Sequence, residues 1–251
     1  MRPASGALAA LGLLCVLAPV GRAAEGEAAA IVEKALKAHF PKGLDTKNQG
    51  LRTKSKGTVH VAGMDLDFSQ EITVQMPNKF KETTELTVMG QNVTIRSVYN
   101  GKDAWIRAGD TDVPVTDEIK AEFKDAVHSM GLVQGVLLKE KGVKLALLGE
   151  AKVKGKPAVG VTVSGEGNKD VNLFFDKATG LIVKVEMRKR DLMSGQEVTE
   201  ERFITEYQEA AGRKVAKKIE VVRDGKPYLE AELTDVQILE KVDDGEFVQP
   251  K

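Results

Sequence analysis

Apolar and polar residues alternate in short runs from about residue 58 to residue 240, and turn residues separate the runs. The alternation is clear in Leu66 and Phe68, and again in Ile72, Val74 and Met76. Because successive side chains of a strand point to opposite faces, this pattern makes one face of a sheet apolar and the other polar. Repeated about ten times with short connections, it predicts one large antiparallel sheet that curls around something apolar.

Two segments change to helical spacing. Residues 27–40 carry apolar residues along one face and charged residues along the other, and Pro41 and Gly43 follow directly. This pattern predicts an amphipathic helix that needs an apolar surface to lie on. Residues 115–141 form a second helical insert, which begins with Thr116 as a typical N-cap.

The end of that insert is the most apolar part of the chain after the N-terminal region. We expect residues 132–141 to form a second helical piece, with Gly131 as an interruption before it. Two glycines within residues 130–138 indicate a segment that bends or moves, so we expect it to act as a lid together with the first helix. No Pro/Ser-rich linker separates the strands on either side, so residues 24–251 are expected to form a single domain.

The N-terminus has the pattern of a secretory signal peptide over residues 1–23. Arg2 gives a basic start, residues 7–20 are apolar or small, and the expected cut follows Ala23 or Ala24. The alternative is a retained membrane anchor, but the apolar run is shorter than the roughly 20 residues that a span needs.

Removal of this peptide changes the composition. Cys15 is the only cysteine of the chain and would be lost, which leaves a mature protein without a thiol. Loss of Arg2 and Arg22 from 37 basic residues leaves 35 against 37 acidic ones, a net charge of −2. The two signs are interleaved and aromatic residues make up only 5%, so neither a basic nucleic-acid footprint nor base-stacking platforms are predicted.

Residues with catalytic or metal-binding chemistry are sparse. His39, His60 and His128 are the only histidines and lie on different predicted elements. Asp65 and Asp67 share one strand face, as a calcium site or a glycosidase-like pair would require, but such a pair more often lies on the solvated face. We therefore predict no catalytic residue, no metal site and no cofactor; a hydrolase would need titratable residues gathered inside the concavity.

Trp105 is the only tryptophan and follows the Asn100-Gly101 turn signal. Two interpretations stay open for it. The ring is either a large core plug or part of a lipid-facing cavity wall with its indole N–H toward the rim.

Residues 99–105, Tyr-Asn-Gly-Lys-Asp-Ala-Trp, resemble the LolA/LolB-type periplasmic lipoprotein carriers, the outer-membrane lipoprotein-sorting proteins. Residues 148–157 and 175–184 fit the same resemblance, which extends over nearly the whole mature chain. It implies a mainly β fold with helices: an incomplete antiparallel β-barrel of about 10–11 strands, with helices covering the open, concave side.

The resemblance also implies a function. Such a protein is a non-catalytic periplasmic carrier that holds the acyl chains of a lipid or lipoprotein in an apolar cavity and exchanges them with a membrane-bound donor or acceptor protein. The family has a positively charged cavity residue, for which Arg52, Arg96 and Arg107 are the candidates here. The alternative is an envelope sensor or protein-binding module on the same scaffold.

The candidate ligand-binding residues are apolar side chains of the predicted concave face and of the two helical segments. They are Leu36, Phe40, Leu66, Phe68, Ile72, Val74, Met76, Leu86, Val88, Val93, Ile95, Trp105, Phe123, Val127, Met130 and Leu132.

Overall fold

The computed structural model describes residues 20–45, 50–191 and 194–250, with side chains described from residue 25 onward. Helix α1 (Val20–His39) ends before Pro41 as predicted, but it begins earlier than residue 27. The expected signal-peptide cut falls within its first turns, and Cys15 lies outside the described residues.

Thirteen strands form one continuous antiparallel sheet. Its spatial order is β6-β5-β4-β3-β2-β1-β13-β12-β11-β10-β9-β8-β7. The bounds are β1 (Gly50–Val61), β2 (Met64–Gln75), β3 (Lys79–Val88), β4 (Gln91–Tyr99), β5 (Ala104–Ala108), β6 (Thr111–Val113), β7 (Lys144–Val153), β8 (Lys156–Ser164), β9 (Val171–Asp176), β10 (Ile182–Arg190), β11 (Glu197–Ala210), β12 (Arg213–Arg223) and β13 (Lys226–Leu239).

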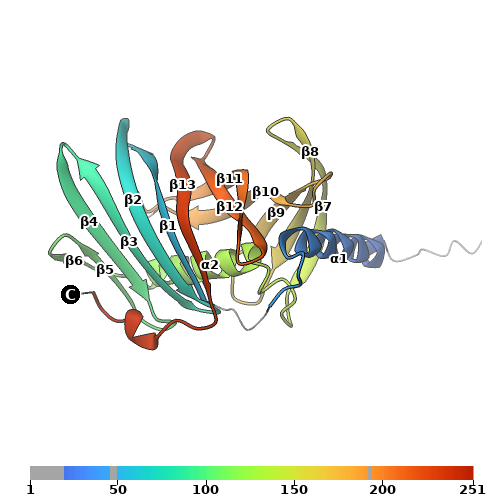
Figure 1. The fold of residues 1–251 in the computed structure, drawn as a ribbon, viewed down its shortest axis with the longest axis horizontal. Coiled ribbons are helices and arrows are strands. Elements are labelled where there is room, and N and C mark those ends of the chain that lie inside the picture. Colours follow the sequence, from blue (N-terminus) through green and yellow to red (C-terminus); the bar gives the residue numbers. More distant parts are fainter. Residues whose placement is uncertain (1–19, 46–49, 192–193, 251) are drawn as a thin grey trace, which may run out of the picture.

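The sheet is two meanders joined by one long-range pairing. Strands β1–β6 follow one another in space, as do β7–β13, and β1 pairs with β13 in the middle of the sheet. The edge strands β6 and β7 stay apart, so the barrel is not closed (Figure 1). The expectation of an incomplete antiparallel barrel with helices is confirmed, with more strands than the 10–11 expected, including the short, exposed β6.

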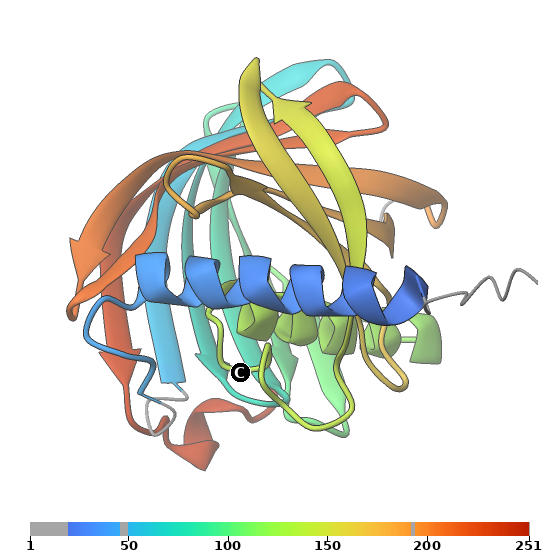
Figure 2. The same ribbon diagram turned by 90° about the vertical axis from the view of Figure 1, so that its right-hand side faces the viewer.

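Helix α2 (Asp117–Val133) connects the two meanders. Its N-cap is Thr116, whose hydroxyl accepts a hydrogen bond from the Ile119 amide at 3.4 Å. Both helices lie across the open side of the curled sheet (Figure 2). The sequence predicted both helices, but not the start of the first or the end of the second.

The second helical piece predicted over residues 132–141 is wrong. After Val133 the chain runs in turns, with Gly135 in the left-handed region at φ +74°. A Cβ at Gly135 would overlap the rings and methyl groups of Phe40 and Leu36, so only glycine allows this close approach. The turns bring Leu138 and its neighbours into the core instead of onto a helix face.

Two apolar cores lie on the inner side of the sheet. The α1 core joins α1 and the segment after α2 to the inner faces of β8–β11, and Leu173 within it is fully buried. The α2 core joins α2 to the ends of β2–β5, with Val127 fully buried at its centre. Phe123 of α2 stacks on Phe80 of β3 with ring centroids 5.8 Å apart.

A third, small cluster lies on the outer side. The C-terminal segment, which contains the 3-10 helix η1 (Asp244–Glu246), packs Val242 and Phe247 against Val98 of β4. Glu246 forms an ion pair with Arg52 at 2.8 Å, which ties this segment to β1.

Candidate ligand-binding surface

Strand register shows which side chains share the inner face of the sheet. Val74 of β2 packs in the α2 core, and it is paired with Leu51 on β1 and Phe80 on β3. Because β1 and β2 pair without a register shift, every second residue from these positions also points inward. The inner face of β1–β4 therefore continues well beyond the part that α2 covers.

Two rows of mainly apolar residues cross this uncovered region, and we call them the inner apolar rows. Both run perpendicular to the strands from β12 through β13 and β1 to β2, and the second continues into β3 and β4. The first row is Val221, Leu229, Val59 and Leu66, and the second is Ile219, Ala231, Gly57, Phe68, Leu86 and Val93.

The inner apolar rows are less completely covered than the two cores. Leu66, Leu86, Val93 and Leu229 are half-buried, whereas Phe68 is 6% exposed. In the described part of the chain, none of the residues of the inner apolar rows belongs to either helix-containing core. The concave wall thus presents apolar surface that neither helix core includes.

Gly57 sits in the second row at a point where β1 and β13 approach closely. A Cβ on Gly57 would overlap the backbone carbonyl of Glu230 on β13. A side chain there would force the two strands apart, so glycine permits their close approach.

The structure divides the candidate ligand-binding residues into four groups. Leu66, Phe68, Leu86, Val88, Val93 and Ile95 lie on the inner wall outside both helix-containing cores, where Phe68 is buried and the other five are half-buried. The α2 core contains Ile72, Val74, Met76, Phe123, Val127 and Met130, and the α1 core contains Leu36, Phe40 and Leu132. Trp105 lies elsewhere.

Trp105 is on the outer face of β5. Its neighbours Ala104 and Ile106 pack in the α2 core, so the alternation of the strand turns Trp105 the other way. It packs with the C-terminal segment beside Val98 and Phe247. The structure therefore places the Trp105 ring in a packed cluster outside the barrel and not in the wall of a cavity.

Sequence reasoning missed the contribution of β12 and β13 to the wall. Val221, Leu229 and Ala231 complete the inner apolar rows, although they lie more than 120 residues after the other wall residues in the chain. Their alternation with charged residues was visible. What was not visible is the pairing of β1 with β13, which places them beside β1.

A charged cluster lies at the β11 end of the first row. Glu200 is 4% exposed and contacts three cations: Arg223 at 3.0 Å, Arg202 at 3.1 Å and Lys189 at 3.4 Å. Burial alone would raise the pKa of Glu200, but the three cations outweigh this effect and lower its pKa to about 2. Glu200 is therefore ionised at neutral pH.

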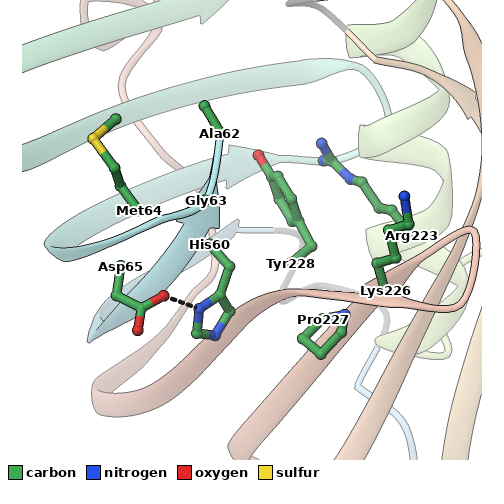
Figure 3. Close-up of a pocket in the computed structure, with 9 residues that line it drawn as sticks. All are labelled: His60, Ala62, Gly63, Met64, Asp65, Arg223, Lys226, Pro227 and Tyr228. Carbon is green, nitrogen blue, oxygen red and sulfur yellow. Dashed lines mark hydrogen bonds and ion pairs between the residues drawn. The ribbon is translucent and has the colours of Figure 1, made fainter.

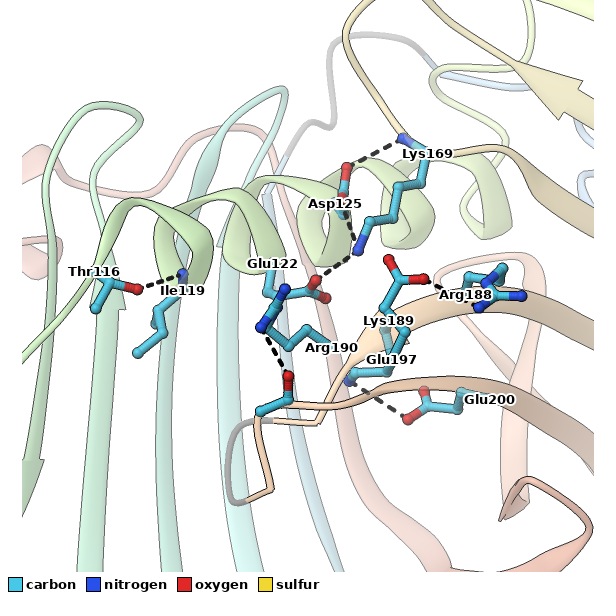
Figure 4. A network of polar contacts seen from close by, with 11 residues as sticks. Thr116, Ile119, Glu122, Asp125, Lys169, Arg188, Lys189, Arg190, Glu197 and Glu200 are labelled. Atoms are coloured by element: carbon cyan, nitrogen blue, oxygen red, sulfur yellow. Dashed lines mark hydrogen bonds and ion pairs between the residues drawn. The ribbon is translucent and has the colours of Figure 1, made fainter.

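Register places this cluster on the inner face. Arg202 pairs with Val221 and Glu200 with Arg223, in line with Ile204, which packs in the α1 core. The electrostatic partner of Lys189 across the concavity is Glu82 of β3, whose pKa is raised by burial. Figure 4 shows the ion pair between Lys189 and Glu200.

The three arginines considered for a cavity position lie on the outer face. Arg52 pairs with Glu246, Arg107 pairs with Asp112 at 2.8 Å, and Arg96 is the register partner of Arg107. Lys189, Arg202 and Arg223 instead lie on the inner face by register. Alternation could have excluded the three outer arginines, since each directly neighbours inward-facing residues in its own strand.

Polar contacts anchor the middle of α2. Lys169, before β9, forms ion pairs with Glu122 at 2.5 Å and Asp125 at 3.7 Å (Figure 4). Lys124 donates to the carbonyl of Gly167 at 2.5 Å. The helix is thus tied to the loop between β8 and β9 as well as to its apolar core.

Helix α1 is held to the sheet through His39. The His39 Nε2 atom accepts a hydrogen bond from the Ile182 amide at 3.1 Å, and Nδ1 lies 3.3 Å from the carbonyl of Lys214. A neutral imidazole with its proton on Nδ1 satisfies both contacts. Burial lowers the pKa of His39, in keeping with that neutral form.

The candidates for hydrolytic chemistry lie away from the concave wall. Asp65 and Asp67 are exposed, and register turns both to the outer face, where His60 Nδ1 lies 2.7 Å from Asp65 Oδ1. Figure 3 shows this pair at a pocket of about 510 Å³, which also includes Arg223 and Tyr228. Within the described residues, no group of three or more metal-ligating side chains gathers as a metal site would require.

A second hollow, of about 640 Å³, lies over β1, β2 and β11–β13. Most of its lining residues are charged or polar and point outward by register, as Lys56, Asp67 and Glu232 do. It is therefore not the apolar cavity that the sequence predicted.

The fold matches solved structures at low sequence identity. A LolA superfamily protein from Nitrosomonas europaea aligns with a TM-score of 0.54 and 12% identity, covering 88% of this chain and 97% of that one. A DUF1329 family protein from Desulfovibrio piger gives 0.52 and 10% over the same shares. An outer-membrane lipoprotein-sorting protein domain from Vibrio parahaemolyticus gives 0.48 and 10%, over 89% and 97%.

The chain has a LolA-like fold. No family model and no curated protein matches the sequence, so the likeness concerns the fold alone. Among the described residues, no helix has the length and apolar character needed to cross a membrane.

Proposed function

We propose that this protein is a periplasmic, non-catalytic carrier that holds the acyl chains of a lipid or lipoprotein against the inner apolar rows. The observation that carries the proposal is the set of half-buried apolar side chains on the concave wall, outside both helix-containing cores. Apolar surface of this kind on a secreted protein is typical of a binding site.

The energetics favour an acyl ligand. Each methylene group buried against the wall contributes about 0.8 kcal/mol, so a chain of about ten methylenes contributes about 8 kcal/mol before ordering costs. Two rows of side chains across several strands match an elongated ligand better than a compact one.

The fold and the N-terminus support the same function. Among the solved structures with this fold is a LolA superfamily protein. The predicted signal peptide would deliver the chain across the inner membrane, where a lipid carrier needs to cover its cargo in water. The helices α1 and α2 and the segment over residues 130–138 would form the lid, and a membrane-bound donor or acceptor protein would exchange the cargo.

A pair of variants on one strand tests the proposal. Leu86 and Thr87 are neighbours on β3 that face opposite sides of the sheet. Leu86→Asp places a charge on the inner wall and should weaken binding of a fluorescent fatty acid by about tenfold or more, whereas Thr87→Asp should leave the affinity unchanged.

Native mass spectrometry of protein purified from its own host gives a second readout. Co-purifying lipid is expected with wild type and with Thr87→Asp, and less with Leu86→Asp. Equal fatty-acid affinity in both variants, or no acyl binding by the wild type, would contradict the proposed site. A protein-binding sensor on this scaffold would give the latter result.

A further inference from the structure

We propose that the cargo carries an anionic head group, a carboxylate or a phosphate, which Arg202 and Lys189 bind at the β11 end of the inner apolar rows. This inference rests on the proposed function and deepens it, because it names the class of amphiphile that the wall accepts. It comes from the alignment of the charged cluster with the first apolar row.

The alignment follows from register. Arg202 on β11 is paired with Val221, the first member of the row, and the row continues through Leu229 and Val59 to Leu66 on β2. Neighbouring strands are about 4.8 Å apart, so the path from β11 to β2 is about 19 Å along the sheet. An acyl chain lying along this row would place its head group at Arg202.

The cluster keeps hydrogen-bonding capacity for a ligand. Arg202 uses one terminal nitrogen for Glu200, at 3.1 Å, and a guanidinium group has five N–H donors. The Arg202 and Lys189 side chains are 29% and 26% exposed, so both reach the concavity, whereas Arg223 is occupied by Glu200 and Asp191.

Glu200 gives the cluster its geometry. A nearly buried carboxylate that contacts three cations fixes their positions without neutralising all of them. Asp191 adds a second negative charge next to Arg223, and Glu82 faces Lys189 from β3.

The dielectric environment strengthens the interaction. The cations lie beside apolar side chains on a curved wall, where the effective dielectric constant is lower than in bulk water. Hydrogen bonds from cations to an anionic oxygen are the strong ones, and an arginine donates two of them to a carboxylate or phosphate.

Calorimetric titration with matched ligands tests the inference at pH 7.5. Dodecanoate and dodecan-1-ol share the same chain and differ in head-group charge. We expect the wild type to bind dodecanoate about tenfold more tightly than the alcohol, and dodecyl phosphate to behave like dodecanoate. Equal affinities for acid and alcohol would overturn the inference and leave the proposed function standing.

Variants locate the charge effect. Arg202→Gln and, separately, Lys189→Gln should bring the affinity ratio of acid to alcohol toward one. Arg188→Gln is the matched control, because Arg188 precedes Lys189 on β10 but points outward and pairs with Glu197 at 3.0 Å. The control should keep the wild-type ratio; an unchanged ratio in both test variants would overturn the inference.

Two further outcomes are distinct. Failure of both dodecanoate and dodecan-1-ol to bind would contradict the proposed function itself. Inorganic phosphate that binds as tightly as dodecyl phosphate would also overturn the inference, since the cluster would then bind anions without the apolar rows. An affinity at least tenfold weaker for inorganic phosphate supports a two-part site.

Discussion

The inner face of the sheet under α1 differs from the inner face beyond α2. Under α1, Leu173, Val161 and Ile182 have almost no exposed surface and are part of the α1 core. Beyond α2, Leu66 and Leu86 have the same alternation in their strands but remain half-buried. The same sequence pattern therefore makes a packed core in one region and a free apolar wall in the other.

This difference separates stability from binding. Apolar side chains with contacts on all sides contribute most to the free energy of unfolding, because their removal leaves a cavity. Those with a free side contribute less to folding and remain available for a ligand. Four predictions sharpen this comparison or break it.

The largest effect is expected from truncation in the packed region. Leu173→Ala should lower the free energy of unfolding by about 4 kcal/mol, whereas Leu86→Ala should lower it by about 1 kcal/mol because Leu86 is half-buried. Urea denaturation of both variants measures the difference. Equal losses would mean that the wall is as tightly packed as the core.

Acid should remove the contribution of Glu200. Its pKa is about 2 in the folded protein against an ordinary value of 4.5, so its stabilisation is complete above pH 4.5 and is lost as the pH falls toward 2. This change amounts to about 3 kcal/mol. Denaturant titrations across this pH range should show a shallower decline for Glu200→Gln than for wild type.

The exposed Glu197, on the same strand, provides the control for that experiment. Glu197→Gln should follow the wild-type pH dependence. A Glu200→Gln profile parallel to that of the wild type would show that the cluster does not hold Glu200 ionised.

A smaller loss of stability is expected from a substitution at Gly57, where β1 and β13 approach closely. Gly57→Ala should destabilise the protein by about 2 kcal/mol, because the added methyl group overlaps the backbone of β13. It should also weaken acyl binding, since β1 and β13 both carry the inner apolar rows. Gly63→Ala, in an open turn with φ +76°, is a comparison that acts through backbone strain and not through overlap.

The smallest effect concerns His39 in the packed region. Burial lowers its pKa from 6.5, so its contribution is complete above pH 6.5 and is lost as the pH falls below that value. Unfolding free energies at pH 7.5 and 5.5 should differ by about 1 kcal/mol more in wild type than in His39→Gln. An identical pH dependence would show that the contact with Ile182 does not require the neutral ring.

Local pattern was enough for much of the fold. Alternation at positions such as Ile72, Val74 and Met76 predicted strands, and the cap at Thr116 predicted the start of α2, because both depend on neighbouring residues only. It failed at residues 134–142, where apolar residues at near-helical spacing form turns. Close packing against Leu36 of α1 and against Phe40, which follows α1, overrides the local preference for helix there.

The sequence by itself determined which side chains alternate, that two amphipathic helices would form, and that the strands would form a curled antiparallel sheet with apolar residues on one face. Only the tertiary structure decided which apolar residues are packed, that Trp105 lies outside, and that Lys189, Arg202 and Arg223 lie inside beside Glu200. The physical reason is the pairing of β1 with β13, which joins residues about 180 positions apart. No local pattern encodes such a contact. The pairing of β1 with β13 nevertheless places β11 and β12 next to the wall and creates the surface on which both proposals depend.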